Sequence, residues 1–302
     1  MAQADFEKES TANATWSRLL AGNRRFAEGK NEHPWQDPQT RESLIDRQNP
    51  DAAVLSCSDS RVPPEIVFDA GLGDLFTIRT AGQVIDDAVL ASLEYAVDSL
   101  HVSLLIVMGH EGCGAIDLAT HELDSMIDAA TTDPASSLEA ADAMDDLDER
   151  IAESESIILR SVGMSIWQAR EAEVDDPADI ERVHVAHTIE DLVSRSEVIQ
   201  NALAHDRLMI VGARYQLSNG KVEVLSFGAT GGRRLGLQTG GRSPCRQHRV
   251  EHDRIRIRRH APGDRTPAGA DRIPIAQYQR RAVRGQDHGT IHEILVGIGV
   301  SE

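Results

Sequence analysis

Aromatic residues, cysteines and long apolar runs are all scarce in this sequence. Phe, Trp and Tyr make up 4% of the 302 residues, so a core has to be built from aliphatic side chains. No apolar run approaches the roughly 18 residues that a transmembrane helix needs. Three cysteines, an odd number, cannot form the disulfide framework of a small secreted domain. The N-terminal stretch MAQADFEKESTANATW has acidic residues and no apolar segment, so we expect no secretory signal and a cytoplasmic protein.

Basic residues are also sparse, except near the end of the chain. The formal net charge is −18, yet residues 230–302 contain 14 Arg against 7 acidic residues. We therefore expect one folded domain over residues 1–230, followed by a disordered Arg-rich tail over residues 231–302. The acidic domain would repel nucleic acid and anionic membrane surfaces, so neither is an expected partner.

The apolar pattern predicts an α/β fold with a mostly parallel central sheet flanked by helices. Nearly continuous apolar runs suit strands that are buried on both faces. Four such runs are AAVLSC (52–57), LFTIRT (75–80), VSLLIVMGH (102–110) and LMIVGARYQL (208–217). Helical spacing of apolar residues at 14–29 and 86–100 supplies the flanking helices. SNG at 218–220 predicts a hairpin turn into an antiparallel edge strand.

Residues 115–206 are expected to be largely helical. DDPAD (175–179) indicates a break, after which TIEDLVSRSEVIQNAL (188–203) reads as one helix with Ser196 in register. His184 and His187 are three residues apart in this region. We interpret them as part of a helix surface rather than as a second metal pair.

Two of the three cysteines lie in short motifs at the ends of predicted strands. Cys57 opens CSDSR (57–61), and GHEGCG (109–114) contains His110 and Cys113. If the first and third strands are neighbours, their carboxyl ends bring these side chains to the crevice where open α/β sheets bind ligands. Two thiolates and one imidazole favour zinc over harder cations. Three protein ligands leave the fourth position open, which is typical of a catalytic zinc site.

Other interpretations of these residues stay open on spacing alone. A lone His-x-x-Cys is most often a buried structural cysteine beside a hydrogen-bonded histidine. A redox pair would use Cys-x-x-Cys, which is absent, and a Cys-based phosphatase would need a longer loop between Cys57 and Arg61. Asp59 and Arg61 could form a structural ion pair. Alternatively, Asp59 could reach the open zinc position, either to accept a hydrogen bond from bound water or to ligate the metal.

The chain resembles the β-class carbonic anhydrases in VLSCSDSRVPPEIVFDAGLGDLFTIRTAG and in SLEYAVDSLHVSLLIVMGHEGCGAI. The resemblance covers about residues 14–228. It implies that Cys57, His110 and Cys113 ligate one zinc ion per subunit, and that Asp59 and Arg61 form the catalytic dyad. It also implies that Asp59 can be a fourth ligand in a closed state. The family fold further implies a homodimer or homotetramer whose N-terminal helices embrace the partner.

The activity implied by the resemblance is the reversible hydration of carbon dioxide to bicarbonate and a proton by zinc-bound hydroxide. Residues 1–230 would then be a zinc-dependent catalytic domain. A related zinc hydrolase acting on a carbon dioxide analogue such as carbon disulfide is one alternative. A non-catalytic protein that binds zinc or bicarbonate for regulation is another. Asp59 and Arg61 argue against the last, because a protein that only binds has no need of them.

Overall fold

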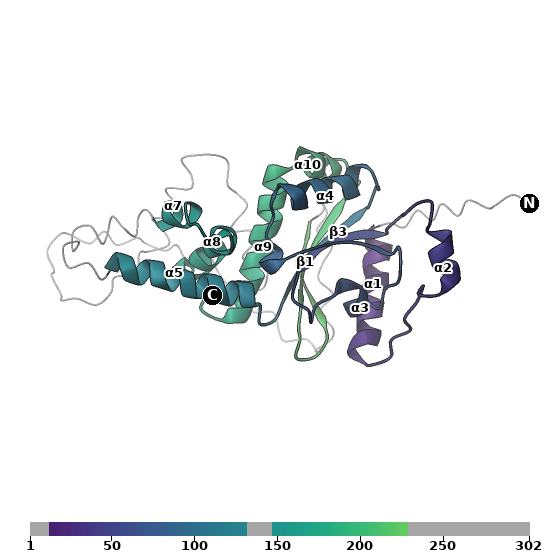
Figure 1. Cartoon of the computed structure of the whole chain (residues 1–302), viewed down its shortest axis with the longest axis horizontal. Helices are drawn as coiled ribbons and strands as arrows, with labels where there is room; N and C mark the ends of the chain where they lie inside the picture. Colours follow the sequence, from purple (N-terminus) through teal and green to yellow (C-terminus); the bar gives the residue numbers. More distant parts are fainter. Residues whose placement is uncertain (1–11, 132–146, 229–302) are drawn as a thin grey trace, which may run out of the picture.

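The computed structural model describes residues 12–131 and 147–228, which are arranged around a five-stranded sheet (Figure 1). The strands are β1 (Ala52–Cys57), β2 (Leu75–Thr80), β3 (Leu104–His110), β4 (Met209–Tyr215) and β5 (Val222–Gly228). Their order is β2-β1-β3-β4-β5. β1 to β4 run parallel and β5 is antiparallel to β4, which confirms the predicted fold class and the edge strand.

Helices cover both faces of this sheet. They are α1 (Ala12–Ala27), α2 (Pro38–Ser43), α3 (Pro64–Val67), α4 (Asp87–Asp98), α5 (Gly114–Thr131), α7 (Leu147–Ala152), α8 (Ile157–Glu171), α9 (Pro177–Arg195) and α10 (Glu197–Ala204). α9 packs on β3 and β4, whereas α1 packs on β3 and α3. Figure 1 shows α4, α9 and α10 on one side of the sheet and α1 and α3 on the other.

The three central strands are apolar because helices cover both of their faces. Every residue of β1, β3 and β4 is buried, whereas the edge strand β2 is only half-buried. α5 begins just after β3 and packs against α8, so these two helices extend away from the carboxyl ends of the strands. The predicted helices at 14–29 and 86–100 are confirmed as α1 and α4.

The single helix predicted over residues 188–203 is wrong. α9 continues through this region only to Arg195, and α10 begins at Glu197. Ser196 between them has an extended backbone, and its hydroxyl accepts a hydrogen bond from the Ile199 N–H. The same hydroxyl donates to Glu94 on α4, at 2.7 Å. An N-cap residue leaves the helical conformation, so the chain changes direction here and α10 can pack on α4.

The Arg-rich tail (231–302), and the disorder expected of it, lie outside the described residues. Among the helices within 12–131 and 147–228, none is long and apolar enough to cross a bilayer.

Candidate metal centre

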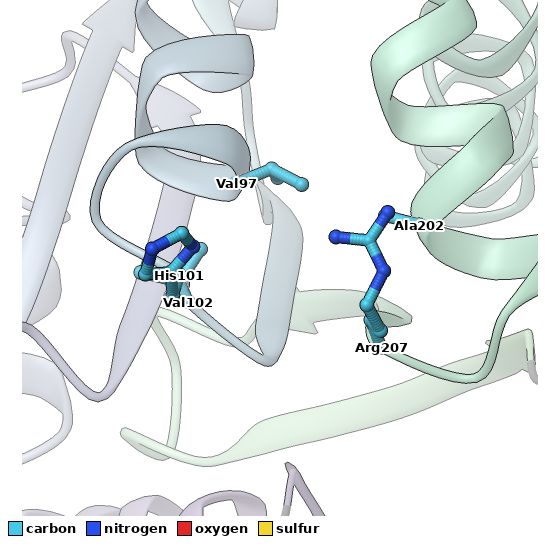
Figure 2. Close-up of a pocket in the computed structure, with 5 residues that line it drawn as sticks. All are labelled: Val97, His101, Val102, Ala202 and Arg207. Carbon is cyan, nitrogen blue, oxygen red and sulfur yellow. The ribbon is translucent and has the colours of Figure 1, made fainter.

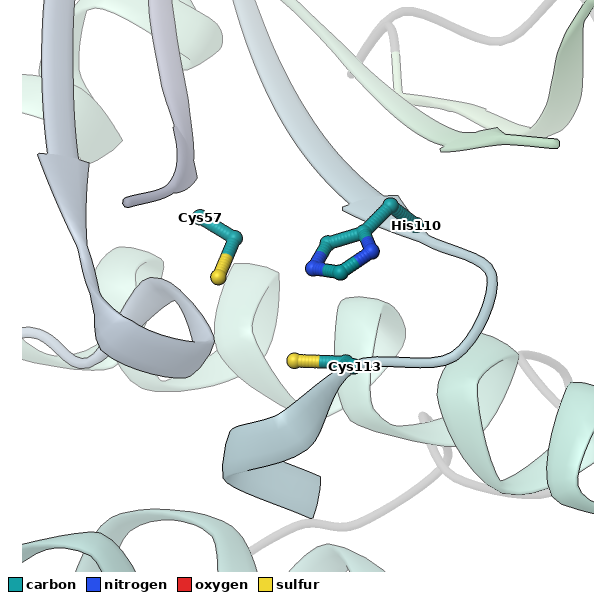
Figure 3. Close-up of side chains that lie close together, drawn as sticks. All are labelled: Cys57, His110 and Cys113. Atoms are coloured by element: carbon teal, nitrogen blue, oxygen red, sulfur yellow. The ribbon is translucent and has the colours of Figure 1, made fainter. Parts of the chain in front are cut away.

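Cys57, His110 and Cys113 meet at the carboxyl edge of the sheet, as the sequence predicts (Figure 3). Cys57 ends β1 and His110 ends β3, and these strands are parallel neighbours. Cys113 directly precedes α5. One ligand atom from each residue lies within 4.8 Å of the others, and all three residues are buried. Figure 3 shows both sulfurs and the imidazole directed toward a common centre.

The turn between His110 and Cys113 depends on glycine. Gly112 has φ +64°, a left-handed conformation that glycine adopts without the steric cost of a Cβ. A Cβ at Gly109 would lie 2.7 Å from Cγ2 of Val185, so a side chain does not fit there. Gly112 thus lets the chain turn from β3 into α5 within a few residues, and Gly109 lets α9 pack closely on the end of β3.

The imidazole of His110 is oriented as a metal ligand. Its Nδ1 lies 2.9 Å from the carbonyl oxygen of Glu111, which can only accept, so Nδ1 carries the proton. Nε2 is buried without a hydrogen-bond partner, and the ring lies beside the two sulfurs. Leaving such an atom unsatisfied costs about 1–3 kcal/mol. A cation held between Nε2 and the two sulfurs would remove that cost, so the residues fit zinc.

The thiols of Cys57 and Cys113 lie close enough to shift each other's pKa. Cys57 Sγ accepts backbone N–H groups of Gly82 and Asp59, each at 3.4 Å. The neighbouring Cys113 thiol, aided by His110 and these N–H groups, lowers the pKa of Cys57 against the effect of burial. The same pairing, together with burial, raises the pKa of Cys113. The protein thus favours one thiolate, and binding of a cation would release the proton of the second.

Asp59 and Arg61 form a bidentate ion pair, as their spacing in the sequence allows. Arg61 Nε donates to Oδ1 at 2.9 Å and Nη2 donates to Oδ2 at 2.6 Å. These hydrogen bonds hold the pKa of Asp59 well below its usual range, although burial acts in the opposite direction. Oδ2 of Asp59 lies 3.9 Å from Nε2 of His110, so the carboxylate borders the metal centre. Arg61 Nη2 also donates to the Gly112 carbonyl, at 3.1 Å.

The turn at residues 110–113, called the ligand turn below, is also supported by a buried ion pair that the sequence analysis missed. Glu181 on α9 accepts the Gly112 N–H at 2.7 Å, and Arg214 on β4 donates to Glu181 at 2.6 Å. Both side chains are only 6% exposed. The Gly112 N–H is thus held by Glu181 and its carbonyl by Arg61. The charged Arg214 inside the apolar run LMIVGARYQL is the feature of the sequence that could have indicated a buried ion pair.

The expected surface position is wrong for His184, whereas His187 is half-buried. His184 is 3% exposed, and its Nε2 lies 2.7 Å from the carbonyl oxygen of Gly82. Both histidines contact the buried hydroxyl of Ser165. His184 follows Ile180 by four residues, so the helical period alone placed it on the buried face of α9.

A cavity of about 300 Å³ lies near the C-terminal ends of α4 and α10 (Figure 2). It is lined by Val97, His101, Val102, Ala202 and Arg207. Figure 2 shows His101 and Arg207 on opposite walls. Val102 just precedes β3, so the cavity is at the amino end of this strand, whereas His110 is at its carboxyl end. Arg207 follows the end of α10, and its backbone N–H donates to the Ala202 carbonyl at 2.9 Å.

Among the described residues, two thiols and one imidazole meet at the carboxyl edge of a parallel sheet, an arrangement typical of a catalytic zinc site in an α/β protein. Comparison with known proteins narrows this class. A family model described as "Carbonic anhydrase" matches residues 52–222. The chain belongs to this family as a β-class carbonic anhydrase, and its substrates are carbon dioxide and bicarbonate.

Relatives within the family match most of the described chain. Carbonic anhydrase 2 of Mycobacterium tuberculosis is 40% identical over 208 residues, which is 69% of this chain and 90% of that protein. A carbonic anhydrase of Mycolicibacterium smegmatis is 41% identical over 213 residues, or 70% of this chain and 93% of that protein. Among solved structures, a tetrameric β-carbonic anhydrase from Sordaria macrospora is 21% identical with a TM-score of 0.48. That match covers 71% of this chain and 99% of the other.

Proposed function

We propose that Cys57, His110 and Cys113 hold the zinc ion, one per subunit, and that carbon dioxide is hydrated beside Asp59 and Arg61. The convergence of three buried ligand atoms within 4.8 Å carries this proposal. Zinc would supply Lewis acidity, which can lower the pKa of a coordinated water from 15.7 to about 7. The protein's part is to orient the ligands, to place a carboxylate beside the reacting centre and to keep the fourth position open.

Arg61 would keep that fourth position open by holding Asp59. Both carboxylate oxygens of Asp59 are hydrogen-bonded to Arg61, so neither is free to replace the substrate water as a ligand. The carboxylate stays ionised because Arg61 lowers its pKa. From its position beside His110 it would accept a hydrogen bond from the reacting water and orient it. The alternative, in which Asp59 is itself the fourth ligand, requires this pair to open.

Serine substitution of the cysteines tests the ligand set. Cys57→Ser and Cys113→Ser should each lose most of the bound zinc, because a serine hydroxyl is a harder and more weakly acidic ligand than a thiol. Carbon dioxide hydration, followed by stopped flow, should fall to the uncatalysed background. Cys245→Ser is the matched control and should keep one zinc per chain. If Cys57→Ser retained both full zinc and full rate, the proposed ligand set would be wrong.

We also propose that the chain forms a homodimer, and its cytoplasmic location stays a prediction. Trp16 and Leu19 of α1 are buried within the subunit, so a partner would need other apolar residues. Trp35, between α1 and α2, is 57% exposed, and its carbonyl accepts the N–H of Leu72, which is 47% exposed. Adjacent exposed apolar side chains are typical of an interface. Light scattering should give twice the mass of 33.0 kDa, and Trp35→Ser should shift it toward the monomer.

A further inference from the structure

A chain of buried polar side chains runs from α9 through α8 to the metal centre. Nδ1 of His187 and Nδ1 of His184 each lie 3.0 Å from the hydroxyl oxygen of Ser165, which is fully buried. Nε2 of His184 lies 2.7 Å from the carbonyl oxygen of Gly82. The N–H of Gly82 in turn donates to the sulfur of Cys57. Side chains of α8 and α9 are therefore linked, through the backbone of Gly82, to the sulfur of Cys57.

The direction of these hydrogen bonds follows from the Gly82 carbonyl, which can only accept. Nε2 of His184 must carry a proton, and burial lowers the pKa of this histidine to about 4, so its Nδ1 is unprotonated near neutral pH. That nitrogen accepts the single hydroxyl proton of Ser165. The Ser165 oxygen must then accept from the Nδ1–H of His187. Each member has one defined role, so the position of the His184 ring is fixed.

The backbone that His184 holds is strained. Gly82 has φ +64°, and Gln83 after it has φ +55°, a left-handed conformation that is costly for a residue with a side chain. Two side chains hold this turn in place. The Gln83 amide donates to the Met108 carbonyl at 2.9 Å, and His184 donates to the Gly82 carbonyl. The N–H of Gly82, at this left-handed turn, donates to the Cys57 sulfur at 3.4 Å.

We propose that His184 is a positioning residue for the metal centre: it fixes the Gly82 turn so that the Gly82 N–H donates to the Cys57 sulfur. The Gly82 N–H holds the Cys57 sulfur, which points toward the common centre of the three ligands. Loss of this donor removes a contact that orients the sulfur, so the three ligand atoms are less well placed to bind one cation. Groups that orient metal ligands in this way typically change metal affinity by about 10–100-fold when they are removed.

The test compares His184→Phe with His184→Gln. Phe keeps a planar ring of similar size but has no donor, whereas Gln can place its Nε2–H where that of histidine lies. Thr188→Val is the matched control: Thr188 is buried on the same helix, and its hydroxyl bonds only the His184 backbone carbonyl in the described structure. Zinc affinity is measured by competition with a chelator. The thiolate-to-cobalt charge-transfer band of the Co²⁺-loaded protein is the second measurement.

We expect His184→Phe to bind zinc about 10-fold more weakly and to shift the cobalt band to lower energy, because a sulfur without its N–H donor gives up charge more easily. His184→Gln should restore both values, and Thr188→Val should leave both unchanged. If His184→Phe does not fold, Ser165→Ala should show the same changes in smaller size, since it removes the partner that fixes the ring. A variant that is less stable but has wild-type zinc affinity and an unshifted band would overturn the proposal.

The role of His184 rests on the ligand set proposed above. Measuring the zinc content distinguishes a failure of the ligand set from a failure of the His184 role. If the unmodified protein binds no stoichiometric zinc, the proposed ligand set fails. If it binds zinc and His184→Phe is indistinguishable from it, only the role of His184 fails.

Discussion

At the scale of single residues, the position of Asp59 decides whether the metal centre is open. Its carboxylate lies 3.9 Å from Nε2 of His110, close enough to compete for a bound cation, and its two oxygens are both hydrogen-bonded to Arg61. Arg61 is 54% exposed, so the pair itself contributes little to the free energy of folding. Its importance is geometric, because it determines where a negative charge stands beside the metal.

Substituting Arg61 tests this role directly. We expect Arg61→Ala to lose most of the hydration rate while keeping one zinc per chain, because Asp59 would be free to turn onto the metal. Stopped-flow hydration and metal analysis on the same sample give the two values. Arg41→Ala, at an exposed position on α2, is the control and should retain the full rate. An Arg61→Ala protein with undiminished rate would show that the pair has no part in the reaction.

The sequence predicts the three ligand residues because they lie in two compact motifs at strand ends. It does not predict Glu181, Ser165 or His184, which act on the site from α8 and α9 across more than fifty residues of chain. Their contacts arise from how helices pack on the sheet, and neither motif contains information about that packing. The periodicity of α9 placed His184 on the buried face, yet burial alone does not reveal a bond to Gly82.

At the scale of elements, the ligand turn is held between β4, α9 and the end of β1. Glu181 binds the Gly112 N–H and is neutralised by Arg214, while Arg61 binds the Gly112 carbonyl. Arg214 Nη1 is also 3.7 Å from Glu223, which is itself paired with Arg182. The turn therefore depends on a charge network whose central pair is almost fully buried.

A double-mutant cycle measures that central pair. Glu181→Gln keeps an acceptor for Gly112 but leaves the charge of Arg214 with only the more distant carboxylate of Glu223, at 3.7 Å. We expect it to lower the free energy of unfolding by about 3 kcal/mol, because removing one member of a buried pair leaves the charge of the other poorly compensated. Glu181→Gln combined with Arg214→Met should recover most of this loss in urea denaturation. Simple additivity of the two single variants would mean that the pair is not coupled.

The elements themselves could be predicted to different degrees. Strands such as β1 and β3 follow from continuous apolar runs, because only a doubly covered sheet explains them. The end of α9 could not be predicted from apolar spacing, since Ser196 continues the helical register. Its hydroxyl instead caps α10 and bonds Glu94 on a helix a hundred residues earlier. A capping serine is visible in the sequence, but the tertiary partner that decides between cap and helix interior is not.

For the molecule as a whole, neutral buried histidines make stability depend on pH. Burial lowers the pKa of His184 to about 4, with a small further lowering from the charge of His187, while the Gly82 bond and the Cys57 thiolate act to raise it. The unfolded chain has an ordinary histidine with a pKa near 6.5. Between these two values the unfolded state binds more protons than the native state. Stability therefore rises with pH across this window and is lost as pH falls from about 6.5 to 4.

Replacing His184 with glutamine should remove this contribution. Across pH 6.5 to 4, the free energy of unfolding of the unmodified protein should fall by up to about 3 kcal/mol more than that of His184→Gln, at about 1.4 kcal/mol per pH unit. Urea denaturation at several pH values measures both slopes, and any loss of zinc in acid affects both proteins alike. Thr188→Val removes a buried polar group but no titrating one, so its slope should follow the unmodified protein. Equal slopes for His184→Gln and the unmodified protein would mean that the native pKa of His184 lies near the unfolded value of about 6.5, and that burial does not lower it.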